Sequence, residues 1–421
     1  MLGIKYLSQA HLKGFERYKY NSIDTSYLSV YVMHPFWNNC VKFLPMWLAP
    51  NIITFIGFLL TVVNFLLIAY YDWDFTAANS KENTVPSWVW SVAALNILLY
   101  YNLDGMDGKQ ARRTGTSGPL GELFDHGLDS YSAGLIPIYM FSLFGSNDLP
   151  PIRMFSVLWT VFLNFYLTHV EKYNTGVMFL PWAYDVTMWG VSITMFVTTL
   201  LGPSIWHYRI FFDLSMANMF EFVLIGSGII TSHPIILKNI YMSYKNKTGK
   251  MRPILEAVRP LFAFVWLFVI TLIWSLYSRN GIINLEPRIL FLLFGTLFSN
   301  IAVRRTPNNR EHSLNSSYLQ SRLIVAQMSD TRCDAFNILM WPLVAIVAIS
   351  CFPWYKQLMG VDIAAHTERW IVQALTIFVT IAHIHYGQGV VREMCDHFNI
   401  RCFKITSIVL LEQELQQNAT V

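Results

Sequence analysis

The sequence predicts an all-α membrane protein: a polytopic membrane helical bundle with about ten transmembrane helices and an N-terminal interfacial helix. The first observation is composition, because 54% of the 421 residues are hydrophobic and only 13% are charged, about half the charged fraction of a soluble domain. The second is that the apolar residues cluster in windows of about 20, the length that crosses about 30 Å of hydrocarbon as a helix. The third is that Lys and Arg collect in alternate connections.

The ten expected spans lie near residues 51–71, 87–103, 120–144, 154–168, 186–202, 216–237, 260–278, 289–303, 336–352 and 370–390. Of the 30 Lys and Arg residues, 23 fall in the N-terminal segment and in the connections on its side, and 7 fall on the other side. Since positive residues favour the cytosolic side of a membrane, both termini are expected in the cytosol. Orientation accounts for the basic residues, so no nucleic-acid partner is expected.

The regions outside the spans define the rest of the organisation. Residues 28–48 are rich in aromatic side chains and interrupted by Pro35 and Pro45, which is typical of a helix lying along the membrane surface. Residues 304–321 are polar and are expected to form a cytosolic insertion, far from the active site. The predicted units are an N-terminal segment (1–50), a catalytic membrane core (51–237), C-terminal transmembrane helices (238–402) and a cytosolic tail (403–421) without a catalytic signal.

Residues 103–130 carry the chemistry, because four Asp, one Glu and one His lie there beside two apolar spans. A charge in the middle of a membrane helix costs about 2.5 to 3.5 kcal/mol, so it indicates a function. Asp104, Asp107, Gly108 and Ala111 follow the i, i+3, i+4, i+7 spacing and share one helix face. The two small residues let a ligand approach the backbone, and the following Arg112 can bind phosphate in bidentate fashion.

The same spacing recurs after the Gly115–Pro119 turn, in Glu122, Asp125, His126 and Asp129. Two polar faces are therefore expected to meet, with two carboxylates from each helix. Such an oxygen-rich cage suits Mg²⁺ or Mn²⁺ and has room for two ions. Interhelical salt bridges with the neighbouring basic residues are the alternative, but they do not require two matched faces. The expected metal ligands are Asp104, Asp107, Asp125 and Asp129.

This pattern resembles the signature of the CDP-alcohol phosphotransferases, Asp104-x-x-Asp107-Gly108-x-x-Ala111-Arg112, then eight residues, Gly121, three residues, Asp125, three residues and Asp129. The resemblance implies metal-dependent transfer from a CDP-alcohol, with the four Asp as metal ligands. Pro50-Asn51-x-x-Thr54 is similar to the family segment beside the cytidine. The residues implied to lie at the nucleotide are Asn51, Gly108, Ala111, Arg112 and Gly121.

Further segments are similar to the ethanolamine-transferring members of the eukaryotic choline and ethanolamine branch. They are HPFWN (34–38), DGMDG (104–108), KYNTG (172–176), FLPWAYD (179–185) and AHIHYG (382–387). The resemblance implies that the hydroxyl of diacylglycerol, or of an alkyl-acylglycerol, attacks CDP-ethanolamine in an endoplasmic reticulum or Golgi membrane. It also implies a possible homodimer.

Two other functions stay open at this point. CDP-choline is an alternative donor, because choline differs from ethanolamine only by three N-methyl groups. A membrane transporter is the more distant alternative, since intramembrane charge is also typical of transporters. The charges lie in one helix pair, however, with no matching cluster in the second half of the chain.

The sequence offers two candidates for the general base. His126 titrates near neutral pH and can be oriented by Glu122 one turn earlier, so we favour this pair. Asp129, or direct activation by metal, is the alternative. His169, Glu171 and Glu221 are expected either to line a head-group pocket or to face cytosolic water.

Overall fold

The computed structural model describes residues 5–79, 84–180, 182–210, 212–303, 323–333, 339–352 and 363–405. The expected insertion at 304–321 and most of the expected tail lie outside these residues. Ahead of the bundle, the chain forms α1 (Gln9–Glu16), β1 (Ser22–Asp24), η1 (Ser29–Met33), α2 (His34–Cys40) and η2 (Val41–Phe43).

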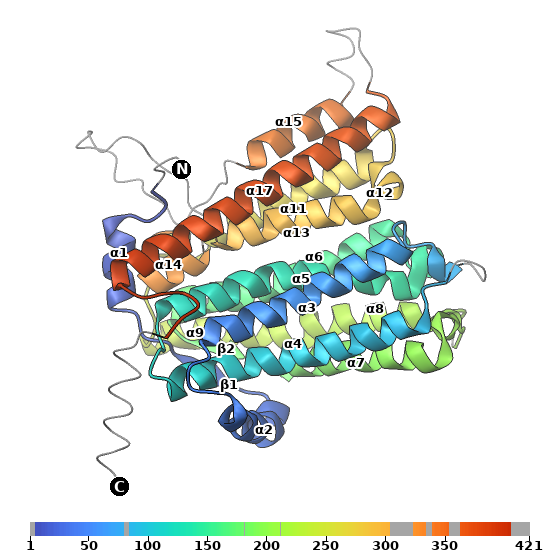
Figure 1. Ribbon diagram of the computed structural model, residues 1–421. Coiled ribbons are helices and arrows are strands. Elements are labelled where there is room, and N and C mark those ends of the chain that lie inside the picture. The colour runs from blue at the N-terminus through green and yellow to red at the C-terminus, as the bar shows by residue number, and fades with distance from the viewer. Residues whose placement is uncertain are drawn as a thin grey trace.

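Long helices running side by side make up the body of the protein (Figure 1). They are α3 (Pro50–Tyr71), α4 (Ser87–Arg113), α5 (Pro119–Asp148), α6 (Pro151–Thr175), α7 (Trp182–Leu201), α8 (Met216–Ser227), α9 (His233–Asn246), α11 (Arg259–Tyr277), α13 (Pro287–Val303), α15 (Met340–Cys351) and α17 (Ala365–Phe398). The short elements between them are η3 (Ala77–Asn79), β2 (Met178–Leu180), η4 (Pro203–His207), η5 (Gly228–Ser232), α10 (Ile254–Ala257), α12 (Ile282–Leu285) and α14 (Leu323–Ser329).

The all-α membrane architecture is confirmed. A helix occupies each of the ten expected ranges, as far as the described residues extend. Among those residues, five helical stretches are long and apolar enough to cross a membrane: Pro50–Tyr71, Trp182–Leu201, Met216–Asn246, Arg259–Tyr277 and Ala365–Phe398. The number of ten crossings stays a prediction. Helices α4 and α5 have 27 and 30 residues but carry the charged faces, and their neighbours surround them.

The bundle has two layers that meet along α5 and α13. Helices α3 to α9 form one layer, and α11 to α17 form the other (Figure 1). Glycines allow the close crossing between the layers, because a Cβ on Gly134 would lie 3.2 Å from the Cα of Gly295. Beside this crossing, the rings of Phe162 and Phe298 stack with centroids 4.2 Å apart. The second half of the chain is therefore packed directly against the helix that carries the second polar face.

Helix α2 lies across the direction of the bundle and is viewed nearly end-on in Figure 1. Its Trp37 is buried and donates a hydrogen bond from Nε1 to Oδ1 of Asn102, at 2.9 Å. Tyr31 in η1 and Phe43 in η2, on either side of α2, are 71% and 88% exposed. This orientation, with aromatic side chains directed outward, fits the predicted interfacial helix. Gly105 permits the contact with α4, because a Cβ there would lie 2.4 Å from the Trp37 ring.

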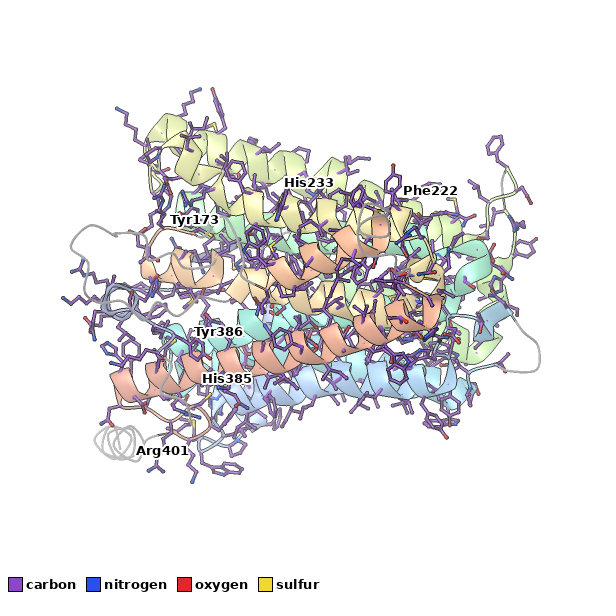
Figure 2. All side chains as sticks on the ribbon, turned by 90° about the horizontal axis from the view of Figure 1, so that it is seen from above. Tyr173, Phe222, His233, His385, Tyr386 and Arg401 are labelled. Carbon is purple, nitrogen blue, oxygen red and sulfur yellow. The ribbon has the colours of Figure 1, made fainter. Side chains whose placement is uncertain are left out.

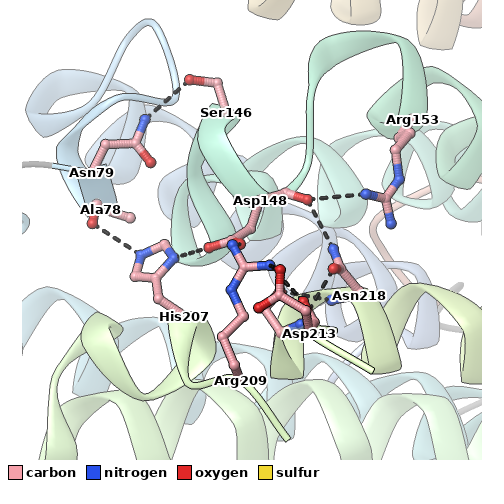
Figure 3. Close-up of polar contacts among 10 residues, drawn as sticks. Ala78, Asn79, Ser146, Asp148, Arg153, His207, Arg209, Asp213 and Asn218 are labelled. Carbon is pink, nitrogen blue, oxygen red and sulfur yellow. Dashed lines mark hydrogen bonds and ion pairs between the residues drawn. The ribbon is translucent and has the colours of Figure 1, made fainter. Parts of the chain in front are cut away.

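A polar cluster fixes the connections at the end of the bundle opposite to α1 (Figure 3). The carboxylate of Asp148, at the end of α5, pairs with His207 and with Arg209. The Asp148 carbonyl accepts hydrogen bonds from Arg153, at 3.2 Å, and from Asn218, at 2.9 Å. Asp148 thus joins the end of α5 to α6, to α8 and to the connection between α7 and α8.

We expect Gly105→Ala to destabilise the protein, because the new methyl group overlaps the buried Trp37 ring. Overpacking of this kind costs about 1 to 3 kcal/mol. Thermal unfolding in detergent measures the change. Gly127→Ala on α5 is the matched control, because a Cβ there meets nothing within 4 Å. Equal melting temperatures for the two variants would contradict the role given to Gly105.

Candidate active site

The two predicted polar faces meet at the end of the bundle where α4 ends and α5 begins. The Thr114 hydroxyl donates to the carbonyl of Gln110 at 2.8 Å, and Gly115 adopts a left-handed conformation with φ 63°. The chain can therefore reverse within a few residues and place α5 beside α4. The side chain of Gln110 donates to the carbonyls of Pro45 and Leu48, which fixes the segment leading into α3 against the same corner.

Three carboxylates form a group that can bind a metal ion. Ligand oxygens of Asp104, Asp107 and Asp125 all lie within 4.8 Å of one another. Oδ1 of Asp125 is buried and has no hydrogen-bond partner among the described residues. A buried carboxylate oxygen without a donor is costly, and an added cation would satisfy it. The residues present therefore fit a hard divalent cation.

Hydroxyl groups from the surrounding helices hold the carboxylates in place. Tyr184 on α7 donates to Asp104 at 2.9 Å, and Thr54 on α3 donates to Asp107. Asp129 lies outside the group of three, and its Oδ1 accepts a hydrogen bond from Tyr100 at 2.8 Å. Each of these hydrogen bonds fixes the orientation of its carboxylate.

Glu122 has partners other than the one predicted. One of its oxygens is paired with Lys172 on α6, and the other accepts a hydrogen bond from the Tyr18 hydroxyl at 2.5 Å. Burial and the Glu122 carboxylate raise the pKa of Tyr18 well above its ordinary value, so this hydroxyl stays a donor at physiological pH. Among the described residues, no hydrogen bond joins Glu122 to His126. The expected orienting pair is therefore not formed in this structure.

His126 is buried between Asp125 and a second histidine. Its Nε2 lies 3.9 Å from Oδ2 of Asp125, and its ring meets His169 edge to face, with centroids 5.1 Å apart. His169 in turn contacts Gln327 on α14. Helix α14, which follows the expected insertion in the chain, thus packs against α5 and α6 and extends to this histidine.

One cavity of about 1200 Å³ connects this site with the interior of the bundle. Its polar half contains the four Asp, Glu122 and His126, and also the predicted nucleotide residues Asn51, Gly108, Ala111, Arg112 and Gly121. Its other half continues between α5, α6, α7 and α8. That half is mainly apolar, and its walls include Ile136, Met140, Phe144, Val157, Val161 and Leu224. The cavity can therefore hold a charged ligand at one end and an apolar ligand at the other.

The comparisons with known proteins agree with this geometry. Residues 47–227 match the family described as CDP-alcohol phosphatidyltransferase. The chain is 42% identical to ethanolaminephosphotransferase 1 of Homo sapiens over 407 residues, covering 96% of each protein. The chain belongs to the CDP-alcohol phosphatidyltransferase family. It is also 41% identical to ethanolaminephosphotransferase 1 of Mus musculus, covering 96% of each protein. Its identity to choline/ethanolaminephosphotransferase 1 of Arabidopsis thaliana is 28%, covering 95% of this chain and 98% of the relative.

Segments outside the family match complete the site. At the N-terminal side, β1 pairs with β2 in parallel, and Tyr20, Ser22 and Asp24 line the cavity. Sequence reasoning gave this segment no part in the site. Its local pattern carries no signal, because the contact that places it is between residues more than 150 positions apart.

The turn after α17 also lies over the site. The Asn51 side chain donates to the carbonyl of Cys402 at 2.9 Å, and the Phe403 ring packs against Phe124, with centroids 5.6 Å apart. Arg401 and Lys404 line the cavity, and Figure 2 shows Arg401 at the same end of the bundle as His385 and Tyr386. The predicted tail therefore begins inside the site, and the adjacent basic and aromatic residues were the signal that could have indicated it.

We expect Lys172→Met to destabilise the protein strongly, because the side chains of Lys172 and Glu122 are only 3% and 6% exposed. Removal of one partner from a buried ion pair costs about 3 to 5 kcal/mol. Thermal unfolding of the single variant and of the double variant Glu122→Gln/Lys172→Met measures the coupling. The double variant should recover much of the loss. Lys245→Met, at an exposed position on α9, is the control, and a loss of similar size there would contradict the assignment.

Proposed function

We propose that this protein transfers phosphoethanolamine from CDP-ethanolamine to the hydroxyl of diacylglycerol, or of an alkyl-acylglycerol, forming phosphatidylethanolamine and CMP. The names of its relatives support the reaction. The observation that carries the proposal is the continuous cavity, which joins a carboxylate cage to an apolar chamber. A water-soluble donor and a lipid acceptor can meet only where two such environments adjoin.

The donor belongs in the polar half. Asp104, Asp107, Asp125 and Asp129 would hold Mg²⁺ or Mn²⁺, with two ions as the expected number. Bound metal would supply positive charge that neutralises the diphosphate and stabilises the leaving CMP. Arg112 lies beside Gly108, where a Cβ would come 3.6 Å from the guanidinium. Its fork can bind a phosphate in bidentate fashion, while Asn51 and Gly121 bound the region assigned to cytidine.

Transfer depends mainly on position and charge. The acceptor hydroxyl approaches the β-phosphorus in line with the departing CMP oxygen, and its proton passes to a base. His126 is the proposed base, because it is buried beside Asp125 and lines the cavity. Asp129 is the alternative base. Glu122 takes part indirectly, since it joins Lys172 on α6 and Tyr18 of the N-terminal segment to the start of α5.

The acceptor belongs in the apolar half, and the surroundings of the bundle support a membrane location. On α8 and η5, Phe222, Val223 and Ile230 are more than half exposed, as Figure 2 illustrates for Phe222.

We propose ten membrane crossings in the endoplasmic reticulum or Golgi, with both termini cytosolic. Helix α1 and the end of α17 lie at the same end of the bundle (Figure 1), as an even number of crossings requires. A homodimer is an expectation from the family resemblance.

CDP-choline is the second candidate donor, because the similar Arabidopsis thaliana protein is named for both head groups. The transporter alternative gains no support from the described residues, in which the one group of possible metal ligands lies at one end of the cavity.

The deciding experiment offers CDP-ethanolamine or CDP-choline with diacylglycerol to purified protein in lipid micelles. We expect ethanolamine transfer that disappears when divalent metal is chelated and returns with Mg²⁺ or Mn²⁺. Asp125→Asn should reduce the rate at least a hundredfold, since it weakens metal binding and charge neutralisation together.

Asp213→Asn is the matched control, because Asp213 is exposed at the opposite end of the bundle. Preferred transfer from CDP-choline would correct the head group and keep the mechanism. Equal activity in the presence and absence of metal would show that the carboxylate cage does not act by binding metal in this reaction.

A further inference from the structure

A second histidine lies at the place where the polar and apolar halves of the cavity meet. His169 is only 1% exposed, and its Nε2 has no hydrogen-bond partner among the described residues. It nevertheless lines the cavity, with Asp125, His126 and Thr168. A buried ring nitrogen without a partner is unfavourable, so a ligand in the cavity is the natural candidate to provide one.

The position of His169 on α6 indicates what that ligand is. Residues 157, 161, 164, 165 and 168 line the cavity on one face of this helix, and His169 follows them toward the carboxylate cage. The next polar side chain on that side is Lys172, which pairs with Glu122. The cavity wall on α6 is thus apolar at Val157, Val161 and Phe165, becomes polar at Asn164 and Thr168, and reaches the carboxylate cage at His169. An acceptor lipid with its chains in the apolar half must place its glycerol group at this boundary.

Gln327 contacts His169 at Nδ1 and leaves Nε2 directed away from it. The side-chain nitrogen of Gln327 lies 3.0 Å from Nδ1 of His169, closer than the amide oxygen at 3.3 Å. Donation from the Gln327 amide to Nδ1 would leave the proton of a neutral imidazole on Nε2. The unpartnered atom is then an N–H donor, which suits an ester or hydroxyl oxygen of glycerol.

We propose that His169 binds the acceptor lipid by donating a hydrogen bond from Nε2 to an oxygen of its glycerol group, which directs the free hydroxyl toward His126. Gln327 acts as a positioning residue that holds the His169 ring and its tautomer. The assignment rests on the proposed function, because it names the acceptor-binding group of that reaction. It also gives α14, which lies outside the family match, a part in substrate binding.

The test separates the two substrates. His169→Phe keeps a ring of similar shape against His126 but removes the donor. We expect the KM for diacylglycerol in mixed micelles to rise about tenfold, the effect of one lost hydrogen bond, while the KM for CDP-ethanolamine stays unchanged. His169→Gln retains a side-chain N–H donor and should recover part of the affinity. Gln327→Leu should produce a smaller change of the same kind.

His366→Phe is the matched control, because His366 is exposed at the far end of α17. An unchanged KM for diacylglycerol in His169→Phe, or equal increases in both KM values, would overturn the assignment. If His169→Phe does not fold, the same comparison is made with His169→Gln and Gln327→Leu. Failure of the parent protein to transfer from either donor would instead refute the proposed function.

Discussion

The accumulation of carboxylates inside a membrane bundle is the constraint on which the rest of this structure depends. Charge within a membrane span is expensive, and neighbouring carboxylates also repel one another. The fold meets this cost with hydroxyl donors from α3 and α7 and with a cage that fits divalent metal. Helices α4 and α5 can carry polar faces only because apolar neighbours surround them, so the architecture of the outer helices follows from the chemistry of the inner pair.

Sequence periodicity was sufficient for the features that depend on a single helix. The i, i+3, i+4, i+7 spacing placed Asp104 and Asp107 on one face, and the structure extends α4 through both residues to Arg113. The same spacing brought Asp125 and His126 to the cavity. The small residues Gly108 and Gly121 also line it. A rule based on helix geometry can predict these positions because neighbouring turns fix them.

Helix periodicity could not predict the contacts between segments that are distant in the sequence. Glu122 lies one turn before His126, which favoured a pair, but its oxygens are engaged by Lys172 and Tyr18. A lysine fifty positions away stabilises a buried carboxylate more than a neutral imidazole does, because the lysine provides a full opposite charge. The contact between Asn51 and Cys402 likewise depends on how α17 packs. Local spacing contains no information about either partner.

The active site therefore requires more than the segment that carries the signature. The family match ends at residue 227, yet Gln327 and Cys402 come from the second half of the chain and contact residues at the cavity. Helix α13 makes this possible, because its close crossing with α5 at Gly134 and Gly295 places α14 beside α6. The first half supplies the charged groups. The second half positions the boundary between charged and apolar walls, and only at that boundary can a soluble donor and a lipid acceptor react.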